Sequence, residues 1–545
     1  MTADLVVIGR IATLAGDAAD DLGLVEAIAV EGGRVRAAGR RVDVEIVAGP
    51  AARRIVLGAD EVVIPGLTDA HLHLADAAVA AVQLDLERAA TLAEGLARIR
   101  TAHDALDDPA AWLRGGGWDA GRWGAWPSAA ALETVAPGRR VVLWSHDLHA
   151  VWASAAALAV ARVTAETPDP PGGIVRRLAD GAPEGVLHED ATGLVTAHAP
   201  TLAPDRLADL IERYCRRLLG FGVVAAHEPG ELETDARLER GFAAIERLAR
   251  DGRLPIRVHA GIRKGALGLA IGRGLRSGAP LGPAEGRARV GWLKLFGDGT
   301  LGSRTAAILE PYADEPSRGA PPAGPLGTYV TEPAEMAELA RTAAEAGIAT
   351  QIHAIGDRSL RAALDALEPT AGRTALRARV EHVQLVDDAD LPRFGRSGIV
   401  ASVQPADLRD DAAKARRAWG GRADTSYPWA RLLASGATLA FGTDAPAADD
   451  DPWPALAMAV RRRDPGWPAD TPALAPAEAI TLPQALRAAC VGAATAAGES
   501  DRGRLTSGQR ADLLVVPAAT LTDTDALRLA RPRLVLMDGV VVHEA

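Results

Sequence analysis

The chain has 545 residues, of which 48% are hydrophobic and 24% charged, a composition that excludes disordered and fibrous proteins. Its formal net charge of −11 argues against a nucleic-acid or anionic-membrane partner, because a phosphate-binding surface needs concentrated Lys and Arg. The two cysteines, Cys215 and Cys490, exclude a disulfide scaffold and lack Cys-x-x-Cys spacing. We interpret both as buried structural thiols.

The sequence carries neither a membrane span nor a leader segment that we can identify. No stretch of 18 residues is apolar and free of charge. The first 16 residues include Asp4 and alternate like a strand, with no basic leader before a long apolar run. We therefore expect a cytoplasmic location and no membrane partner.

Both ends of the chain predict short β-strands. From Asp4 to about Ile64, Val/Ile/Ala-rich runs are broken by glycines, and the last 45 or so residues show the same pattern. Neither end can bury a face alone, so we predict that they pair into one β-sandwich. Residues 1–62 would form its N-terminal part and residues 496–545 its C-terminal part.

The middle of the chain alternates brief apolar runs with longer Ala/Leu/Arg/Glu stretches, which is typical of βα units around a parallel sheet. Eight candidate strands fall near 61–66, 222–227, 254–259, 290–296, 348–353, 379–383, 398–403 and 438–443. Eight strands with helical crossovers predict an α/β fold, a (β/α)8 TIM barrel, over residues 63–495.

A long insertion separates the first two predicted barrel strands. The gap of about 155 residues is too long for one crossover, so we predict an inserted structure at about 80–215. More than half of the tryptophans lie there: Trp112, Trp118, Trp123, Trp126, Trp144 and Trp152. Trp118, Trp123 and Trp152 either line a pocket for an apolar substrate group or pack the insertion onto the barrel.

The strongest local motif is Val-Ile-Pro-Gly-Leu-Thr-Asp-Ala-His-Leu-His, which ends at His71 and His73. Two histidines at i and i+2 of an extended segment project to the same side, with Cα atoms roughly 6.5 to 7 Å apart. Both imidazoles can then bind one metal ion. A His-x-His pair alone is weak evidence, because strand-end histidines are also common without a metal.

Further polar side chains follow four later predicted strands. They are Lys294 in Gly-Trp-Leu-Lys-Leu-Phe-Gly-Asp-Gly, His353 in Gln-Ile-His-Ala-Ile-Gly-Asp, His382 in Arg-Val-Glu-His-Val-Gln and Asp444 in Phe-Gly-Thr-Asp-Ala-Pro. Barrel enzymes place their catalytic groups at the C-terminal ends of the strands. The set therefore predicts one metal centre with far more specificity than any of its members.

Each member of this set also has a structural interpretation. Lys294 could form an ion pair with an acid such as Asp298. His353 and His382 could be core histidines with satisfied hydrogen bonds, and Asp444 could cap the turn before Pro446.

The whole pattern resembles the amidohydrolase superfamily, and within it the branch of N-substituted formamide deformylases and related amide hydrolases. The resemblance spans nearly the whole chain. Besides the metal-ligand candidates it rests on Gly-Trp-Asp119 with Trp123, His149-Ala-Val-Trp-Ala-Ser-Ala-Ala-Ala-Leu158, Asp298-Gly-Thr-Leu-Gly-Ser-Arg304 and Gly508-Gln-Arg-Ala-Asp-Leu-Leu-Val-Val516. In that family the chain ends form a β-sandwich and the first-strand insertion caps the site.

The resemblance implies a zinc centre with one or two ions per chain. His71 and His73 would bind the more buried metal, and His353 and His382 a second one. Asp444 would contact metal and act as the base, and Lys294 would bridge the ions as a carboxylated lysine. Such a bridge requires a neutral amine, which a desolvated lysine near cations can supply. Trp292, Lys294 and Phe296 share one strand face. If that face is turned toward the helices, Lys294 cannot bridge two ions and a mononuclear site is favoured.

Further substrate contacts are expected from the same resemblance at Trp118, His149, Trp152, His227 and Asp298. His227 is followed by Glu228 where the family usually has Asp, and Ser154 stands where the family usually has Asn. His259 is interpreted as structural.

The predicted function is hydrolysis of a carbon–nitrogen bond, amide or formamide-like, by a metal-activated water. Zn²⁺ can lower the pKa of bound water to about 7, and Asp444 would move the proton to the leaving nitrogen. Alternatives are a hydrolase or deaminase that acts on a cyclic amide or ester, or a barrel that binds metal or ligand without turnover. We expect a small-molecule substrate, no nucleic-acid partner and a possible homodimer.

Overall fold

The computed structural model describes residues 3–16, 18–146, 150–170, 173–189, 191–200, 202–232, 239–314 and 324–545. It divides into two compact units, one formed by Met1–Ala75 with Ala208–Ala545 and the other by Asp76–Leu207. Each unit is described separately. No helix in the described ranges is both long and apolar enough to cross a membrane. Cys215 and Cys490 are buried and unpaired, as predicted.

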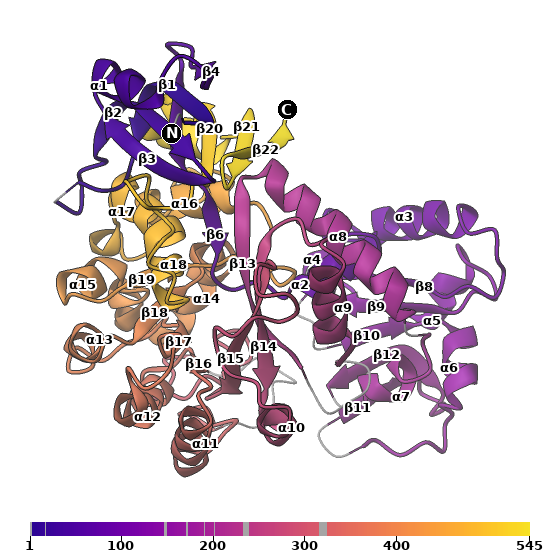
Figure 1. Cartoon of the computed structure of the whole chain (residues 1–545). Coiled ribbons are helices and arrows are strands. Elements are labelled where there is room, and N and C mark those ends of the chain that lie inside the picture. The colour runs from indigo at the N-terminus through magenta and orange to yellow at the C-terminus, as the bar shows by residue number, and fades with distance from the viewer. Residues whose placement is uncertain are drawn as a thin grey trace. The chain divides into compact units, whose positions relative to one another are not determined.

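The larger unit contains an eight-stranded parallel sheet with helices along the chain between its strands (Figure 1). In spatial order its strands are β6 (Leu67–Asp69), β13 (Val223–Leu232), β14 (Arg257–Arg263), β15 (Ala288–Phe296), β16 (Thr350–Ala354), β17 (Arg379–His382), β18 (Val400–Val403) and β19 (Leu439–Phe441). Val, Ile, Leu and Ala dominate these strands because both faces are covered. The prediction of a parallel βα barrel is confirmed.

Backbone hydrogen bonds next to β6 and β19 connect the two end strands of this sheet. The amide of Ala70 donates to the carbonyl of Phe441 at 2.9 Å, and the amide of Asp444 donates to the carbonyl of His71 at 2.7 Å. The amide of His73 donates to the carbonyl of Ala445 at 3.0 Å. These bonds close the barrel at the residues that carry the His-x-His motif and Asp444.

The helices of the larger unit follow the barrel strands in sequence. They are α8 (Pro204–Gly220), most of which belongs to this unit, α9 (Glu239–Arg250), α10 (Leu267–Gly272), α11 (Pro333–Glu345), α12 (Asp357–Leu367), α13 (Leu391–Ser397), α14 (Leu408–Trp419), α15 (Trp429–Ala434), α16 (Pro452–Arg461), α17 (Leu482–Arg487) and α18 (Ala493–Ala496). Helix α2 (Leu74–Ala80) follows β6, and most of it belongs to the smaller unit. Helix α11 shows how the sequence sets such bounds. It begins with Pro333, whose missing amide is not needed in a first turn, and ends before Gly347, which has φ 79°.

A mixed sheet joins the two ends of the chain (Figure 1). Its N-terminal members are β1 (Leu5–Ala12), β2 (Leu24–Glu31), β3 (Arg34–Gly39), β4 (Arg53–Val56) and β5 (Glu61–Pro65), with helix α1 (Arg41–Ala48), and its C-terminal members are β20 (Leu513–Pro517), β21 (Leu534–Met537) and β22 (Val540–Glu544), with helix α19 (Thr524–Arg528). Antiparallel pairing of β5 with β20 connects the two groups.

The first barrel strand differs from the predicted one. Residues 61–66 were predicted to start the barrel, but β5 pairs with β20 in the terminal sheet, and the barrel begins at β6 after Gly66. A Cβ atom on Gly66 would lie 2.6 Å from Val224 Cγ2. The chain passes from one sheet to the other at this residue because only glycine allows so close an approach.

The smaller unit contains a six-stranded sheet. Its strands, in spatial order, are β11 (Gly173–Arg177), β12 (Pro183–Glu189), β10 (Ala150–Ala153), β9 (Val141–Ser145), β8 (Leu113–Trp118) and β7 (Leu84–Asp85), and its helices are α3 (Leu92–Asp104), α4 (Ala120–Trp123), α5 (Ala129–Glu133), α6 (Ala155–Ala161) and α7 (Thr192–Thr196). This unit spans Asp76–Leu207, and the limits of the insertion at about 80–215 stay a prediction.

Candidate metal centre

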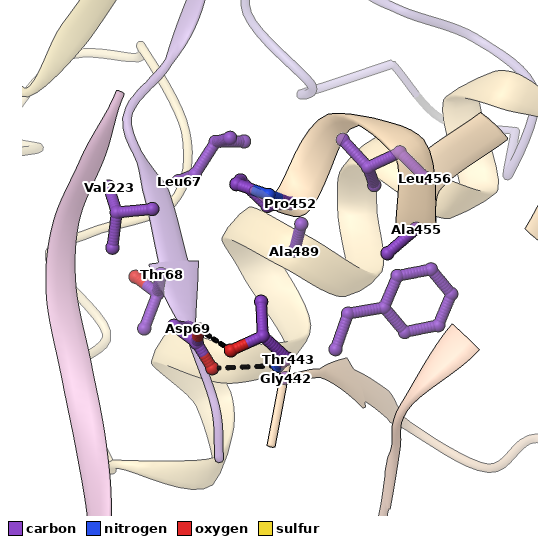
Figure 2. Close-up of a pocket in the computed structure, with 11 residues that line it drawn as sticks. Leu67, Thr68, Asp69, Val223, Gly442, Thr443, Pro452, Ala455, Leu456 and Ala489 are labelled. Atoms are coloured by element: carbon purple, nitrogen blue, oxygen red, sulfur yellow. Dashed lines mark hydrogen bonds between the residues drawn. The ribbon is translucent and has the colours of Figure 1, made fainter. Parts of the chain in front are cut away.

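Asp69 fixes the barrel closure at the end of β6. Its Oδ1 accepts hydrogen bonds from the amides of His71 and Thr443, each at 3.0 Å, and its Oδ2 accepts one from Thr443 Oγ1 at 2.6 Å. Figure 2 shows the two bonds between Asp69 and Thr443 as dashed lines. Burial raises the pKa of Asp69 to about 7. Asp69 therefore holds together the segments that carry His71 and Asp444.

The small cavity beside this seam is not a substrate site. Its volume is about 20 Å³, roughly the space of one water molecule. Apart from Thr68, Asp69 and Thr443, the side chains that line it are apolar (Figure 2).

Three side chains converge at the C-terminal end of the barrel. Ligand atoms of His71, His382 and Asp444 all lie within 4.8 Å of one another. Asp444 Oδ1 lies 3.3 Å from His71 Nε2 and 3.4 Å from His73 Nε2. His71 Nε2 is buried and makes no hydrogen bond with the residues that the structure describes. Strand ends far apart in sequence thus bring together three side chains of the types that bind metal ions.

The protonation states of His71 and Asp444 depend on their burial and on the charged side chains next to them. Burial by itself would raise the pKa of Asp444, but the neighbouring His71, His73 and His382 outweigh it and hold that pKa well below its usual range. Burial, reinforced by Lys294, keeps the pKa of His71 well below its usual value. His71 is therefore a neutral imidazole beside an ionised carboxylate, the state that binds a metal ion, whereas for His382 the effect of burial is outweighed by Asp407 and Asp444, which raise its pKa.

Unusual backbone conformations bring two of these side chains together. His382 has φ 73° and Asp444 has φ 60°, in the left-handed region that non-glycine residues rarely adopt. In a regular strand His382 and Glu381 would point to opposite faces. The turn at His382 instead places its ring centroid 5.5 Å from that of His71. Strain of this kind is often found at functional sites.

His353, at the end of β16, belongs to the same cluster. Its ring centroid lies 4.4 Å from that of His382, and its Nε2 lies 3.1 Å from the carbonyl oxygen of Gly299. Burial and the nearby His382 keep its pKa well below the usual value. His353 is thus a neighbour of His382, while the ligand atoms that lie within 4.8 Å of one another are those of His71, His382 and Asp444.

Lys294 lies inside the barrel on β15, on the strand face that also carries Trp292 and Phe296. The lysine is only 1% exposed, and its Nζ lies 4.9 Å from the centre of the Phe296 ring. It makes no hydrogen bond or ion pair with any described residue. Burial lowers its pKa to about 8, although Glu381 and Asp444 act in the opposite direction. A substantial share of this amine is therefore neutral at slightly alkaline pH.

The ion pair between Lys294 and Asp298 does not form. The Asp298 carboxylate instead accepts hydrogen bonds from three backbone amides, those of Ala307 at 2.8 Å, Gly356 at 2.9 Å and Ile355 at 3.1 Å. Burial raises the pKa of Asp298 to about 7. This carboxylate organises the loops after β15 and β16, and its role as a substrate contact stays a prediction.

Two charged residues of β17 were missed by the sequence reasoning. Glu381 Oε2 lies 2.6 Å from His71 Nδ1, and Glu381 Oε1 lies 2.7 Å from Arg379 Nε. Both side chains are fully buried, and the Arg379 guanidinium stacks 3.9 Å from the centre of the Trp292 ring. The signal in the sequence was the alternation Arg-Val-Glu directly before His382. Charges at every second position of a buried strand indicate a polar barrel interior.

His227 is bound to this charged pair. Its Nδ1 lies 3.1 Å from Arg379 Nη1, and its ring centroid lies 5.1 Å from that of His259. Glu228 accepts hydrogen bonds from the amides of Leu74 and Gly230. His227 is thus fully buried among Arg379 and His259, and its contact with substrate stays a prediction.

The tryptophans predicted to contact substrate lie in the core of the smaller unit. Trp118 donates to the carbonyl of Leu143 and Trp152 to that of Ser128, both at 2.8 Å. Each is at most 1% exposed. These contacts place both indoles in the core of the insertion itself, so packing of the insertion onto the barrel and contact with substrate both stay predictions. His149, the remaining predicted substrate contact, lies outside the described residues.

Comparisons with known proteins agree with this geometry. The chain is 28% identical to N-substituted formamide deformylase of Arthrobacter pascens over 95% of both chains. It is 30% identical to Protein LONG AFTER FAR-RED 3 of Arabidopsis thaliana, over 84% of this chain and 78% of that protein. The crystal structure of an uncharacterized metal-dependent hydrolase from Pyrococcus horikoshii OT3 matches with a TM-score of 0.78 and 26% identity, over 96% of this chain and 99% of that one. The family model described as the amidohydrolase family matches residues 59–543. The chain therefore belongs to the amidohydrolase family.

Proposed function

We propose that this protein is a metal-dependent hydrolase that cleaves the carbon–nitrogen bond of a small amide, with formamide-like compounds as the first substrate class to test. The observation that carries the proposal is the convergence of His71, His382 and Asp444, whose ligand atoms lie within 4.8 Å of one another. A relative with 95% mutual coverage is an N-substituted formamide deformylase, which favours this substrate class.

The side chains present fit a zinc ion. Zinc accepts imidazole nitrogens and carboxylate oxygens, and His71 Nε2 is a buried nitrogen that makes no hydrogen bond with a described residue and lies 3.3 Å from Asp444 Oδ1. Glu381 occupies His71 Nδ1, which leaves Nε2 to face the ion. We infer that His71, His73, His353, His382 and Asp444 hold one or two ions. When bound, zinc would supply Lewis acidity that activates water and polarises the substrate carbonyl.

Asp444 is proposed as the proton carrier. Its carboxylate is ionised and 16% exposed, so it can accept a proton from the attacking water and deliver it to the leaving nitrogen. The three histidines around it would keep the carboxylate oriented during this transfer.

Lys294 is proposed as a carboxylated bridging ligand. Its neutral amine would attack carbon dioxide and release one proton, which converts the side chain into a carbamate with two ligand oxygens. Its burial, its lack of an ion pair with described residues and its lowered pKa of about 8 support this role. Without that modification the same site would hold a single ion.

The alternative functions, hydrolysis of another substrate class and ligand binding without turnover, would use the same barrel and the same side chains. A cyclic amide, an ester or a ring amine would need the same water activation. A metal-binding protein without turnover would use the same ligand set, so a measurement of turnover is what distinguishes it from an enzyme.

The test is a hydrolysis assay of the zinc-loaded protein on N-substituted formamides, other amides, cyclic amides and esters. We expect turnover on the amides and a loss of about 100-fold or more in kcat for Asp444→Asn with metal content retained. Asp449→Asn, on the same loop but exposed, serves as the control and should keep full activity. Full activity of Asp444→Asn with metal bound would refute the proton role. No turnover on any compound with full metal occupancy would favour the binding alternative.

A further inference from the structure

A second and larger cavity lies at the opposite end of the barrel from the histidine cluster. Its volume is about 510 Å³, within the range of pockets that hold small molecules. It is lined by the N-terminal part of β14, by the start of β15 and the residues just before it, by the segment around Glu499, and by Arg510 and Asp538 in the loops next to β20 and β21. All of these segments belong to the larger unit.

Two arginines in the cavity wall carry charge that no carboxylate neutralises. Arg287 donates to the carbonyls of Leu254 at 3.3 Å and Pro255 at 2.6 Å. Arg289 donates to three carbonyls within residues 284–288, at 2.7 to 3.0 Å. Neither forms an ion pair with a described residue. Neutral carbonyls satisfy hydrogen bonds but leave the positive charge, so these guanidinium groups attract an anion.

The carboxylates of the same cavity are mostly engaged elsewhere. Three of the four are ion-paired with arginines: Glu499 with Arg502 at 2.5 Å, Asp501 with Arg34 at 2.9 Å and Asp538 with Arg257 at 2.6 Å. The fourth, Glu285, is exposed and forms no ion pair within the described ranges. Among the charged side chains of the cavity wall that form no ion pair with a described residue, two arginines, Arg287 and Arg289, outnumber the single acid Glu285, so this part of the wall is positively charged.

His259 adds a buried polar group without a partner. Its side chain lines the cavity and is only 2% exposed, and its buried Nδ1 makes no hydrogen bond with the residues that the structure describes. Burial lowers its pKa to about 4, so the ring is neutral and offers one donor and one acceptor. A buried polar group that stays unsatisfied is costly, so this ring fits a ligand that carries a hydroxyl group.

We propose that this cavity is a second ligand site, which takes a small hydroxycarboxylate with its carboxylate on Arg287 and Arg289 and its hydroxyl on His259. The site is separate from the metal centre and does not depend on the proposed hydrolase function.

The test is calorimetric titration of the full-length, zinc-loaded protein with malate, succinate and inorganic phosphate at low salt. We expect one malate site per chain, with succinate and phosphate weaker by about tenfold, since each charge-assisted or buried hydrogen bond contributes roughly that factor. Arg287→Gln should weaken malate binding about tenfold or more. Glu285→Gln, an exposed change that removes the unpaired acid, should strengthen it. His259→Phe should abolish the preference for malate over succinate.

Malate can also bind at the metal centre, because carboxylates are metal ligands. Asp444→Asn alters that centre and leaves the cavity unchanged, so it shows at which of the two sites malate binds. Malate affinity that is unchanged in Asp444→Asn supports the second site. The proposal is overturned if malate does not bind, if Arg287→Gln and Glu285→Gln both leave its affinity unchanged, or if only Asp444→Asn alters it. Equal affinity for phosphate would overturn the carboxylate assignment.

Discussion

His71 Nδ1 lies 2.6 Å from Oε2 of Glu381 in the fully buried centre of the barrel. A carboxylate in this position fixes the imidazole tautomer with the proton on Nδ1, so that Nε2 has its lone pair free. Arg379, 2.7 Å from the same carboxylate, supplies a compensating charge. The orientation of the first proposed ligand therefore depends on a strand that comes more than 300 residues later in the sequence.

Glu381→Gln should weaken zinc binding about 10- to 100-fold, because the amide can no longer fix the ring with a negative charge. The measurement is a competition titration against a chelator of known affinity. Glu478→Gln is a matched control, since Glu478 is also buried and bound to an arginine, Arg431, away from the cluster. Equal zinc affinity in wild type and Glu381→Gln would show that Glu381 only packs the barrel.

Lys294→Ala should reduce the metal content from about two ions per chain to one or fewer, because it removes the proposed bridge. Elemental analysis of protein purified without chelator measures this directly. Lys264→Ala removes an exposed lysine and should leave the content unchanged. One ion in both wild type and Lys294→Ala would make the lysine structural and indicate mononuclear chemistry.

The pKa of Lys294 predicts how the stability of the metal-free protein depends on pH. Folding lowers this pKa from 10.5 to about 8, so the folded state binds the proton more weakly than the unfolded state. Below pH 8 the buried charge destabilises the fold, and this penalty disappears between about pH 8 and 10.5. Lys294→Met should thus stabilise the metal-free protein by up to about 3 kcal/mol at pH 7. Urea unfolding at pH 7 and pH 10 should show this gain shrinking, and a gain independent of pH would contradict the titration of Lys294.

The barrel was predictable from sequence because strand-like runs recur with helical stretches between them. The first strand was assigned to the wrong sheet because Val62 to Leu67 is one apolar run, and only tertiary pairing divides it at Gly66. The β-sandwich of the chain ends and its limits at residues 62 and 495 stay predictions, although both ends share one sheet.

The sequence predicted those site residues whose side chains are typical metal ligands. His71, His73, His353, His382 and Asp444 fall at strand ends, where a barrel brings such groups together. Asp69 and Glu381 were missed because their roles depend on partners distant in sequence, Thr443 and His71 respectively. The left-handed backbone of His382 has no local signal such as a glycine.

Thr443→Val should destabilise the protein by about 1 to 3 kcal/mol, because it removes the 2.6 Å hydrogen bond to Asp69 and leaves a buried carboxylate oxygen unsatisfied. Chemical denaturation of the metal-free protein measures the change. Thr520→Val is the matched control: Thr520 is fully buried, but its Oγ1 has no hydrogen-bond partner among the described residues, so the same substitution should be neutral or stabilising there. Since Asp69 also binds the amide of His71, Thr443→Val should weaken zinc binding as well, whereas Thr520→Val should not. Equal destabilisation by the two variants would mean that the bond to Asp69 does not hold the barrel seam, and that the main-chain hydrogen bonds between the two end segments suffice.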